Sequence, residues 1–203
     1  MLRKSNFVSH VVLLAAFSLV FLASYDLPAF NTPALARTLD SPPATGFALA
    51  PLQNIMQIAA GGSHTCALTT NGGVKCWGDN GSGRLGDGST ITRTMPVDVA
   101  GLDSGVSAIT AGGAHTCALT TNGGVKCWGY NHDGQLGDGT TTTRRTAVDV
   151  MNLSSGVSAL AAGERHTCAL LTNGSIKCWG YNFYGQVGGG TAITYTTPMD
   201  VVG

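Results

Sequence analysis

Histidine and cysteine, two residue types that can catalyse reactions, bind metals or form covalent bonds, recur in this chain at one fixed interval. His64, His115 and His166 each open the string His-Thr-Cys-Ala-Leu, and each lies 51 residues from the next. A second cysteine, followed by Trp-Gly, comes ten residues after the first in every copy. The six cysteines are Cys66, Cys76, Cys117, Cys127, Cys168 and Cys178. A spacing kept without a slip indicates one structural unit copied three times.

The cysteine pairs favour disulfide chemistry. A hairpin whose turn centres on Asn71 places Cys66 directly opposite Cys76, with Cβ atoms about 4.5–5.5 Å apart, near the separation that a disulfide requires. The same register applies to the second and third copies, so we predict three disulfides, each within one copy. Free buried thiols are one alternative. A zinc site built from one histidine and two cysteines is another, although no Cys-x-x-Cys spacing and no evident fourth ligand accompanies it.

Catalysis by the histidines is the other chemistry to weigh. No carboxylate accompanies the histidine within the motif, and the same histidine stands in every copy, so we interpret it as a structural hydrogen-bonding group. The chain contains no G-x-S-x-G, no H-E-x-x-H, no P-loop and no paired carboxylates in register. We therefore predict that the protein is not an enzyme and that it carries no cofactor and no metal.

Short strands must position these residues. In the middle copy we expect strands over 106–110, 115–120, 125–128 and 147–150, with a turn at Thr121-Asn122-Gly123 and a long glycine-rich loop after Trp128. Four short strands per copy, radially repeated, are typical of a propeller blade. The predicted fold is all-β: propeller blades of four antiparallel strands in a partial, three-blade array. The repeats span about 55–104, 106–155 and 157–203 within a domain at 47–203.

The first 46 residues lie outside the repeats. Arg3 and Lys4 precede an apolar run over 7–23, and Ala34-Leu35-Ala36 supplies a small-x-small site, so we predict a signal peptide over 1–36. The alternative is an uncleaved membrane anchor over 7–25. Residues 37–46, with Ser41-Pro42-Pro43, are interpreted as a linker. Both interpretations predict that the repeats are exported to an extracellular, periplasmic or cell-surface location.

Composition argues against a nucleic-acid partner. Charged residues make up 11% of the chain with a formal net charge of zero. Nine Lys or Arg and ten Asp or Glu follow residue 36, and the basic ones are scattered. A phosphate-backbone binder needs a clustered positive face, which is not indicated here.

The repeat resembles a known family. The string GGAHTCALTTNGGVKCWGYNHDGQLGDGT, residues 112–140, is similar to the blade signature of the regulator-of-chromosome-condensation repeat family, and the cysteine pair resembles its bacterial exported members. The resemblance implies a β-propeller, typically of seven blades, that acts as a binding platform. Its members include a nucleotide-exchange factor for a small GTPase and a secreted β-lactamase-inhibitory protein, so exchange or enzyme inhibition are alternative functions. No functional residue transfers by motif.

Three blades do not readily close such a ring. An open arc exposes the apolar faces of its end blades, so we weigh a fragment of a larger seven-blade protein with no independent function, self-association through the end blades, and docking onto another protein. We favour the fragment.

The leading functional hypothesis is an exported, non-enzymatic scaffold that recognises a protein partner, of unknown identity, through its loops. The copies differ most in the loop after Trp-Gly. There the predicted partner-binding residues are Tyr130, His132, Tyr181, Phe183 and Tyr184. Aromatic side chains gathered on one face suit protein binding, whereas the alternative is that they are ordinary exposed loop residues.

Overall fold

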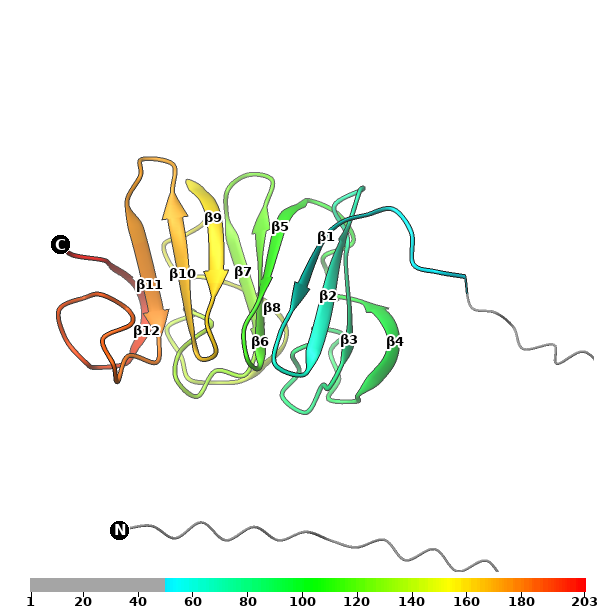
Figure 1. The fold of residues 1–203 in the computed structure, drawn as a ribbon, viewed down its shortest axis with the longest axis horizontal. Coiled ribbons are helices and arrows are strands. Elements are labelled where there is room, and N and C mark those ends of the chain that lie inside the picture. The colour runs from blue at the N-terminus through cyan, green and yellow to red at the C-terminus, as the bar shows by residue number, and fades with distance from the viewer. Residues whose placement is uncertain (1–49) are drawn as a thin grey trace, which may run out of the picture. The chain divides into compact units, whose positions relative to one another are not determined.

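Three four-stranded antiparallel sheets make up the described part of the protein. The computed structural model describes residues 50–203, and its regular structure there is entirely β-strand (Figure 1). Blade 1 contains β1 (Ile55–Ala60), β2 (His64–Thr69), β3 (Val74–Gly78) and β4 (Arg93–Asp98). Blade 2 contains β5 (Val106–Ala111), β6 (His115–Thr120), β7 (Val125–Gly129) and β8 (Arg144–Asp149). Blade 3 contains β9 (Val157–Ala162), β10 (His166–Leu171), β11 (Ile176–Gly180) and β12 (Tyr195–Asp200).

The four-stranded blade expected from the sequence is confirmed, and within each blade the strands pair in chain order. The fourth strand of blade 2 begins at Arg144, three residues before the predicted start. The predicted signal peptide or anchor over 1–36 and the linker over 37–46 lie outside the described residues. Within residues 50–203 no helix is suited to crossing a lipid bilayer.

The central hairpin of each blade has the register that the sequence predicts. Cys66 pairs with Cys76 and Leu68 with Val74, and blades 2 and 3 repeat this pairing. The structure joins the sulfur atoms of all three predicted pairs as disulfides, and no cysteine is left free. The three disulfides indicate folding in an oxidising compartment.

Each blade packs its disulfide side against the tryptophan side of the next. In the first interface Leu68, Val74 and Leu85 of blade 1 pack against Ile109 and Trp128 of blade 2. The second interface repeats this arrangement: Leu119, Val125 and Leu136 of blade 2 are buried with Trp179 of blade 3. The hydrophobic core therefore lies between the blades, and no blade buries its apolar faces alone.

A polar latch joins neighbouring blades inside this core. The Thr116 hydroxyl and the Trp128 indole Nε1 both donate to the Arg84 carbonyl oxygen, at 3.0 and 2.9 Å. Because the hydroxyl has given its single proton to that carbonyl, it accepts the bond from His64 Nε2 at 2.8 Å. Blade 3 repeats the latch on blade 2 with His115, Thr167, Trp179 and Gln135. The structural role predicted for the histidine agrees with these contacts.

Candidate functional site

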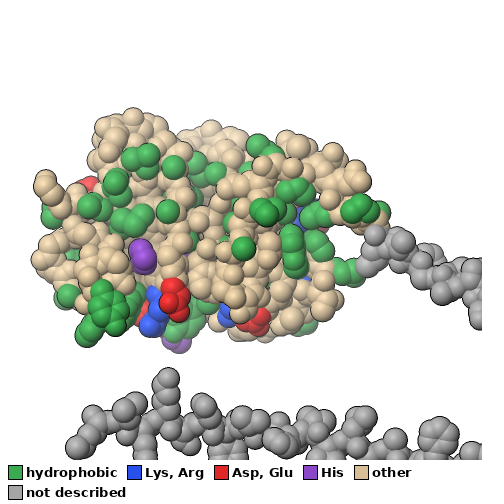
Figure 2. Space-filling model, in the orientation of Figure 1, with side chains coloured by type: hydrophobic (Ala, Val, Ile, Leu, Met, Phe, Trp, Pro, Cys, Tyr) green, Lys and Arg blue, Asp and Glu red, His purple; other side chains and the backbone are tan. Residues whose placement is uncertain are grey.

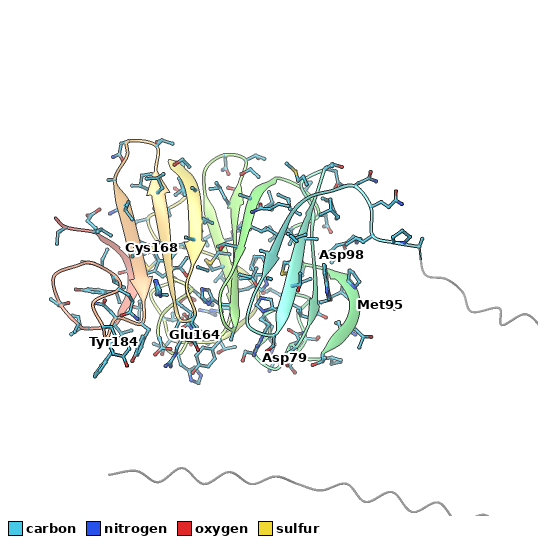
Figure 3. All side chains as sticks on the ribbon, viewed as in Figure 1. Asp79, Met95, Asp98, Glu164, Cys168 and Tyr184 are labelled. Atoms are coloured by element: carbon cyan, nitrogen blue, oxygen red, sulfur yellow. A yellow bond between two sulfur atoms is a disulfide. The ribbon has the colours of Figure 1, made fainter. Side chains whose placement is uncertain are left out.

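Two sets of connections meet at one end of the three blades. The tight turns 61–63, 112–114 and 163–165 join the first and second strands, and the long loops 79–92, 130–143 and 181–194 join the third and fourth. We call the surface that they build the loop face. Figure 3 shows the labelled side chains of Asp79, Glu164 and Tyr184 at this end of their blades.

The long loops are held by a buried asparagine. In blade 2 the Asn131 side chain accepts from the Leu136 amide and donates to Asp138 Oδ1. Asp138 in turn pairs with Arg144 at 2.9 Å. Burial alone would raise the pKa of Asp138, but hydrogen bonds from Thr140 and Arg144 lower it below the usual value. These bonds hold the loop in one conformation, from which its outer residues face solvent.

The loop of blade 3 is built differently. Gly189 stands where blade 2 has Asp138, and Tyr195 stands where blade 2 has Arg144. The hydroxyls of Tyr195 and Thr191 lie 2.7 Å apart, and a Cβ added at Gly189 would lie 3.3 Å from the Tyr195 hydroxyl oxygen. A tyrosine thus replaces the arginine–aspartate pair, and the third loop is held without a buried charge.

A groove crosses the loop face where the three blades meet. It has a volume of about 560 Å³ and is lined by Gly62, Ser82, Arg84, Gly113, Ala114, Tyr130, Glu164 and Arg165. Arg84 pairs with Asp79 at 2.9 Å, and Arg165 pairs with Asp133 at 2.7 Å. Glu164 is exposed and forms no ion pair. Figure 2 shows acidic and basic side chains side by side along this edge, next to apolar ones.

A second groove, of about 340 Å³, continues across blade 3. Its lining is Glu164, Arg165, His166, Tyr181, Tyr184 and Gln186. Arg165 lies over the Tyr181 ring, with its guanidinium carbon 4.8 Å from the ring centroid. Glu164 and Arg165 line both grooves, so they join the two into one continuous surface.

The predicted aromatic residues all lie on the loop face, in two groups. The rings of Tyr130 and His132 lie 4.6 Å apart in the loop of blade 2. In blade 3 the rings of Tyr181, Phe183 and Tyr184 lie 5.4–6.4 Å from one another. Phe183 and Tyr184 are exposed, at 67% and 82%. Glu164 and Arg165, which line both grooves, belong to neither aromatic group.

The sequence interpretation did not assign Arg84, Glu164 and Arg165 to the site. The sequence does mark Glu164 and Arg165 as unusual. The turn before the motif histidine is Gly-Gly-Ser in the first copy and Gly-Gly-Ala in the second, but Gly-Glu-Arg in the third. The same turn forms without charged residues in blades 1 and 2. The repeat fold therefore does not require Glu164 and Arg165.

The recurring histidines and cysteines lie away from the loop face grooves, apart from His166. His64 and His115 are 3% and 0% exposed. Burial, with a smaller contribution from Arg84, lowers the pKa of His64 to about 4, and burial lowers that of His115 to about 3. Among the described residues no group of three or more His, Cys, Asp or Glu side chains is arranged to hold a metal ion.

Three blades of this kind define an arc of a β-propeller, and comparison with known proteins gives the family. Residues 55–84, 106–135 and 157–186 match one form of the Regulator of chromosome condensation (RCC1) repeat, and 71–119 and 122–170 match a second form. The chain belongs to the RCC1 repeat family, as its resemblance suggests.

Similar proteins are much longer than this chain. The Ultraviolet-B receptor UVR8 of Arabidopsis thaliana is 34% identical over 146 residues, which is 71% of this chain and 33% of the receptor. The probable E3 ubiquitin-protein ligase HERC4 of Homo sapiens is 36% identical over 73% of this chain and 14% of the ligase. Prp20p of Saccharomyces cerevisiae superposes with a TM-score of 0.65 at 24% identity, covering 75% of this chain and 39% of Prp20p. The last likeness concerns the fold alone.

Proposed function

We propose that this chain is an exported, non-enzymatic recognition module that binds a protein partner through its loop face. The observation that carries the proposal is the pair of joined grooves, which are lined by tyrosines and arginines, the exposed Tyr184 among them. Tyrosine and arginine are the residue types that dominate binding energy at protein interfaces. The three disulfides and the basic, apolar start of the chain support export through residues 1–36.

The contrast between shared and variable positions of the repeat supports the same proposal. Residues shared by the copies build the blade interfaces and hold the loops, as His64, Thr116 and Asn131 do. Positions that differ between the copies line the grooves: Tyr130 stands where the first copy has Asp79, and Glu164 and Arg165 stand where the second copy has glycine and alanine. Rigid blades thus present a variable surface, which is the arrangement expected of a binding scaffold.

Site-specific photocrosslinking tests the proposal. A benzophenone amino acid placed at Phe183 or at Tyr184 in the full chain is expected to crosslink the same protein from the envelope or secreted fraction of the source organism. Excess unlabelled chain should compete, and Tyr130→Ala combined with Tyr181→Ala should reduce the yield by roughly tenfold or more, as loss of aromatic anchors does.

The matched control is the same amino acid at Thr172, in the turn between β10 and β11 at the opposite end of blade 3. This position is also exposed to solvent. Equal crosslinking from Thr172 and from Tyr184, or a yield unchanged by the tyrosine variants, would show that the loop face is not the binding surface.

Exposed apolar side chains on the outer faces of blades 1 and 3 favour a second interaction, self-association through these end blades. Leu68 and Val74 are 0% and 1% exposed where blade 1 packs on blade 2, whereas their counterparts Leu170 and Ile176 of blade 3 are 41% and 43% exposed. On blade 1, Ile58 is 70% exposed. We propose that a second copy of the chain covers these faces head to tail, because the same two faces pack together twice within the chain.

Analytical ultracentrifugation of the full chain tests this second interaction. Concentration-dependent association that Ile176→Glu abolishes, and that Thr121→Glu at an exposed turn leaves intact, is the expected result. A chain that remains monomeric at all concentrations would reject it.

A further inference from the structure

The charged residues of the described part are almost all paired with one another. Seven ion pairs join fourteen side chains: Lys75–Asp98, Arg84–Asp79, Arg93–Asp87, Lys126–Asp149, Arg144–Asp138, Arg165–Asp133 and Lys177–Asp200. Within residues 50–203 only Asp103, Arg145 and Glu164 remain without an opposite charge. Of these three, only Glu164 lines the grooves of the loop face.

The two arginines of the grooves do not cancel the charge of Glu164. Arg84 is neutralised by Asp79 at 2.9 Å, and Arg165 by Asp133 at 2.7 Å. Arg165 is further held against the Tyr181 ring, 4.8 Å from its centroid. Both guanidinium groups are thus neutralised by aspartates of the same chain. The net charge left on the groove surface is that of the Glu164 carboxylate.

Tyrosines line both of the grooves to which Glu164 contributes. Tyr130 lines the first groove together with Glu164, and Tyr181 and Tyr184 line the second. The face of a tyrosine ring attracts a cation, and a carboxylate pairs with one through charge-assisted hydrogen bonds. The two features together form a recognition site for a guanidinium or ammonium group.

The repeat itself indicates that Glu164 has a role other than folding. Its counterparts are Gly62 and Gly113, where an added Cβ would lie 2.7 Å from the Gly113 carbonyl oxygen and 2.8 Å from the Glu164 carbonyl oxygen, respectively. Glycine in the first two copies is thus explained by close packing of the turns. Glu164 makes no ion pair, and no side-chain hydrogen bond ties it to the fold.

We propose that the loop face recognises its protein partner through a basic side chain, an arginine or lysine that pairs with Glu164 and packs on the rings of Tyr130 or Tyr184. Arginine fits best, because its planar guanidinium can stack on a ring while it bonds a carboxylate in bidentate fashion. The inference rests on the proposed function and names the chemistry that the partner must present at this surface.

Amide NMR titration of the ¹⁵N-labelled full chain with defined peptides tests the proposal. The probes are short Gly/Ser peptides that carry two arginines, two lysines, two citrullines or two glutamates. The arginine peptide is expected to shift the amides of Gly113, Tyr130, Glu164 and Tyr181, and binding should weaken as salt is added. The citrulline peptide has nearly the same shape without the charge, and it should bind roughly fivefold more weakly or worse.

Variants of the chain make the assignment specific. Glu164→Gln should weaken binding of the arginine peptide by roughly fivefold, while its melting temperature stays at that of the wild type. Asp103→Asn is the matched control, because it removes another unpaired carboxylate at the opposite end of the blades and should leave binding unchanged. Tyr130→Leu keeps the apolar bulk but removes the ring face, and it should weaken binding of the arginine peptide more than that of the lysine peptide.

Several results would overturn the proposal. These are equal binding of the arginine and citrulline peptides, tighter binding of the glutamate peptide, or equal losses for Glu164→Gln and Asp103→Asn. If one of them is found together with loop-specific photocrosslinking at Tyr184, the proposed protein recognition is retained. Only the proposal that the partner presents a basic side chain is then rejected. Absence of loop-specific crosslinking would reject the proposed function itself.

Discussion

The motif histidine acts through its neutral form. Its Nε2 hydrogen bonds to a threonine of the next blade, and its Nδ1 is buried without a partner in His64 and His115. A proton added to Nδ1 would create a buried charge with no hydrogen-bond acceptor, which explains why burial lowers the pKa of His64 to about 4 and that of His115 to about 3. The histidine is a structural donor whose protonation opposes the packing of the blades.

Acid should therefore destabilise the protein well above the range in which carboxylates titrate. The unfolded chain binds a proton at each histidine below about pH 6.5, whereas the folded chain keeps His64 and His115 neutral down to about pH 4 and about 3. Protonation thus favours the unfolded state in this window. Stability is fully present above about pH 6.5, and it should fall by roughly 1.4 kcal/mol per pH unit for each histidine as the pH is lowered.

Urea unfolding with intact disulfides, followed by tryptophan fluorescence between about pH 7 and about pH 4.5, measures this slope. Asp87 and Asp138 have lowered pKa values, so their contributions are lost only at lower pH and do not interfere. His64→Gln keeps a hydrogen-bond donor and should remove one histidine's share of the slope. If the free energy of unfolding does not depend on pH in this window, His64 and His115 are not held neutral in the folded protein.

At the scale of the element, the threonine that precedes the first cysteine in blades 2 and 3 links each of these blades to the blade before it. Thr116 of β6 connects His64 and the Arg84 carbonyl of blade 1 to blade 2. Thr116→Val keeps the shape of the side chain but leaves a buried histidine N–H unpaired and takes one donor from the Arg84 carbonyl. We expect a loss of about 2–3 kcal/mol in the free energy of unfolding, measured by urea denaturation.

Thr65 of β2 offers the matched control for this variant. It occupies the same repeat position on the outer side of blade 1, where no histidine of a preceding blade meets it within the described residues. In the monomer, Thr65→Val should change the free energy of unfolding by no more than about 0.5 kcal/mol. Equal losses for the two variants would mean that the threonine acts within its own strand and not between blades.

The strands show how far the sequence determines the elements. A turn centred on Asn71 and a period of two were enough to place Cys66 opposite Cys76, because hairpin register follows from turn position. β8 begins three residues before the start that the sequence predicts. A register shift between Cys127 and Gly129 pairs Gly129 with Arg144, and no apolar alternation marks that irregular pairing.

The loop face was only half predictable for a similar reason. Differences between the copies identified Tyr130, Tyr181, Phe183 and Tyr184, because long loops tolerate change and show it plainly. Glu164 and Arg165 stand in a tight turn beside the His-Thr-Cys string, which all three copies share. That this turn reaches the same grooves as the long loop follows from the packing of neighbouring blades, which a single repeat does not specify.

At the scale of the whole molecule, the stacking of blades gives chemically identical disulfides different environments. Cys66–Cys76 and Cys117–Cys127 are 0% exposed because the next blade covers them. Cys168 of blade 3 is partly exposed, beside the exposed Leu170 and Ile176. A reductant must collide with a sulfur atom, so access separates the three bonds even though each closes a loop of the same length.

Limited reduction of the native monomer should therefore proceed in order. Cys168 and Cys178 are expected to become alkylated first at low reductant, as read by mass spectrometry of tryptic peptides. The other four cysteines should react later, and only under conditions that separate the blades, because opening either buried bond requires loss of the interface that covers it. Thr116→Val, which weakens the first interface, should speed labelling of Cys66 and Cys76 more than that of Cys117 and Cys127. Simultaneous labelling of all six cysteines in the folded protein would show that the blades separate freely, and the interfaces would then not be the stabilising units of the fold.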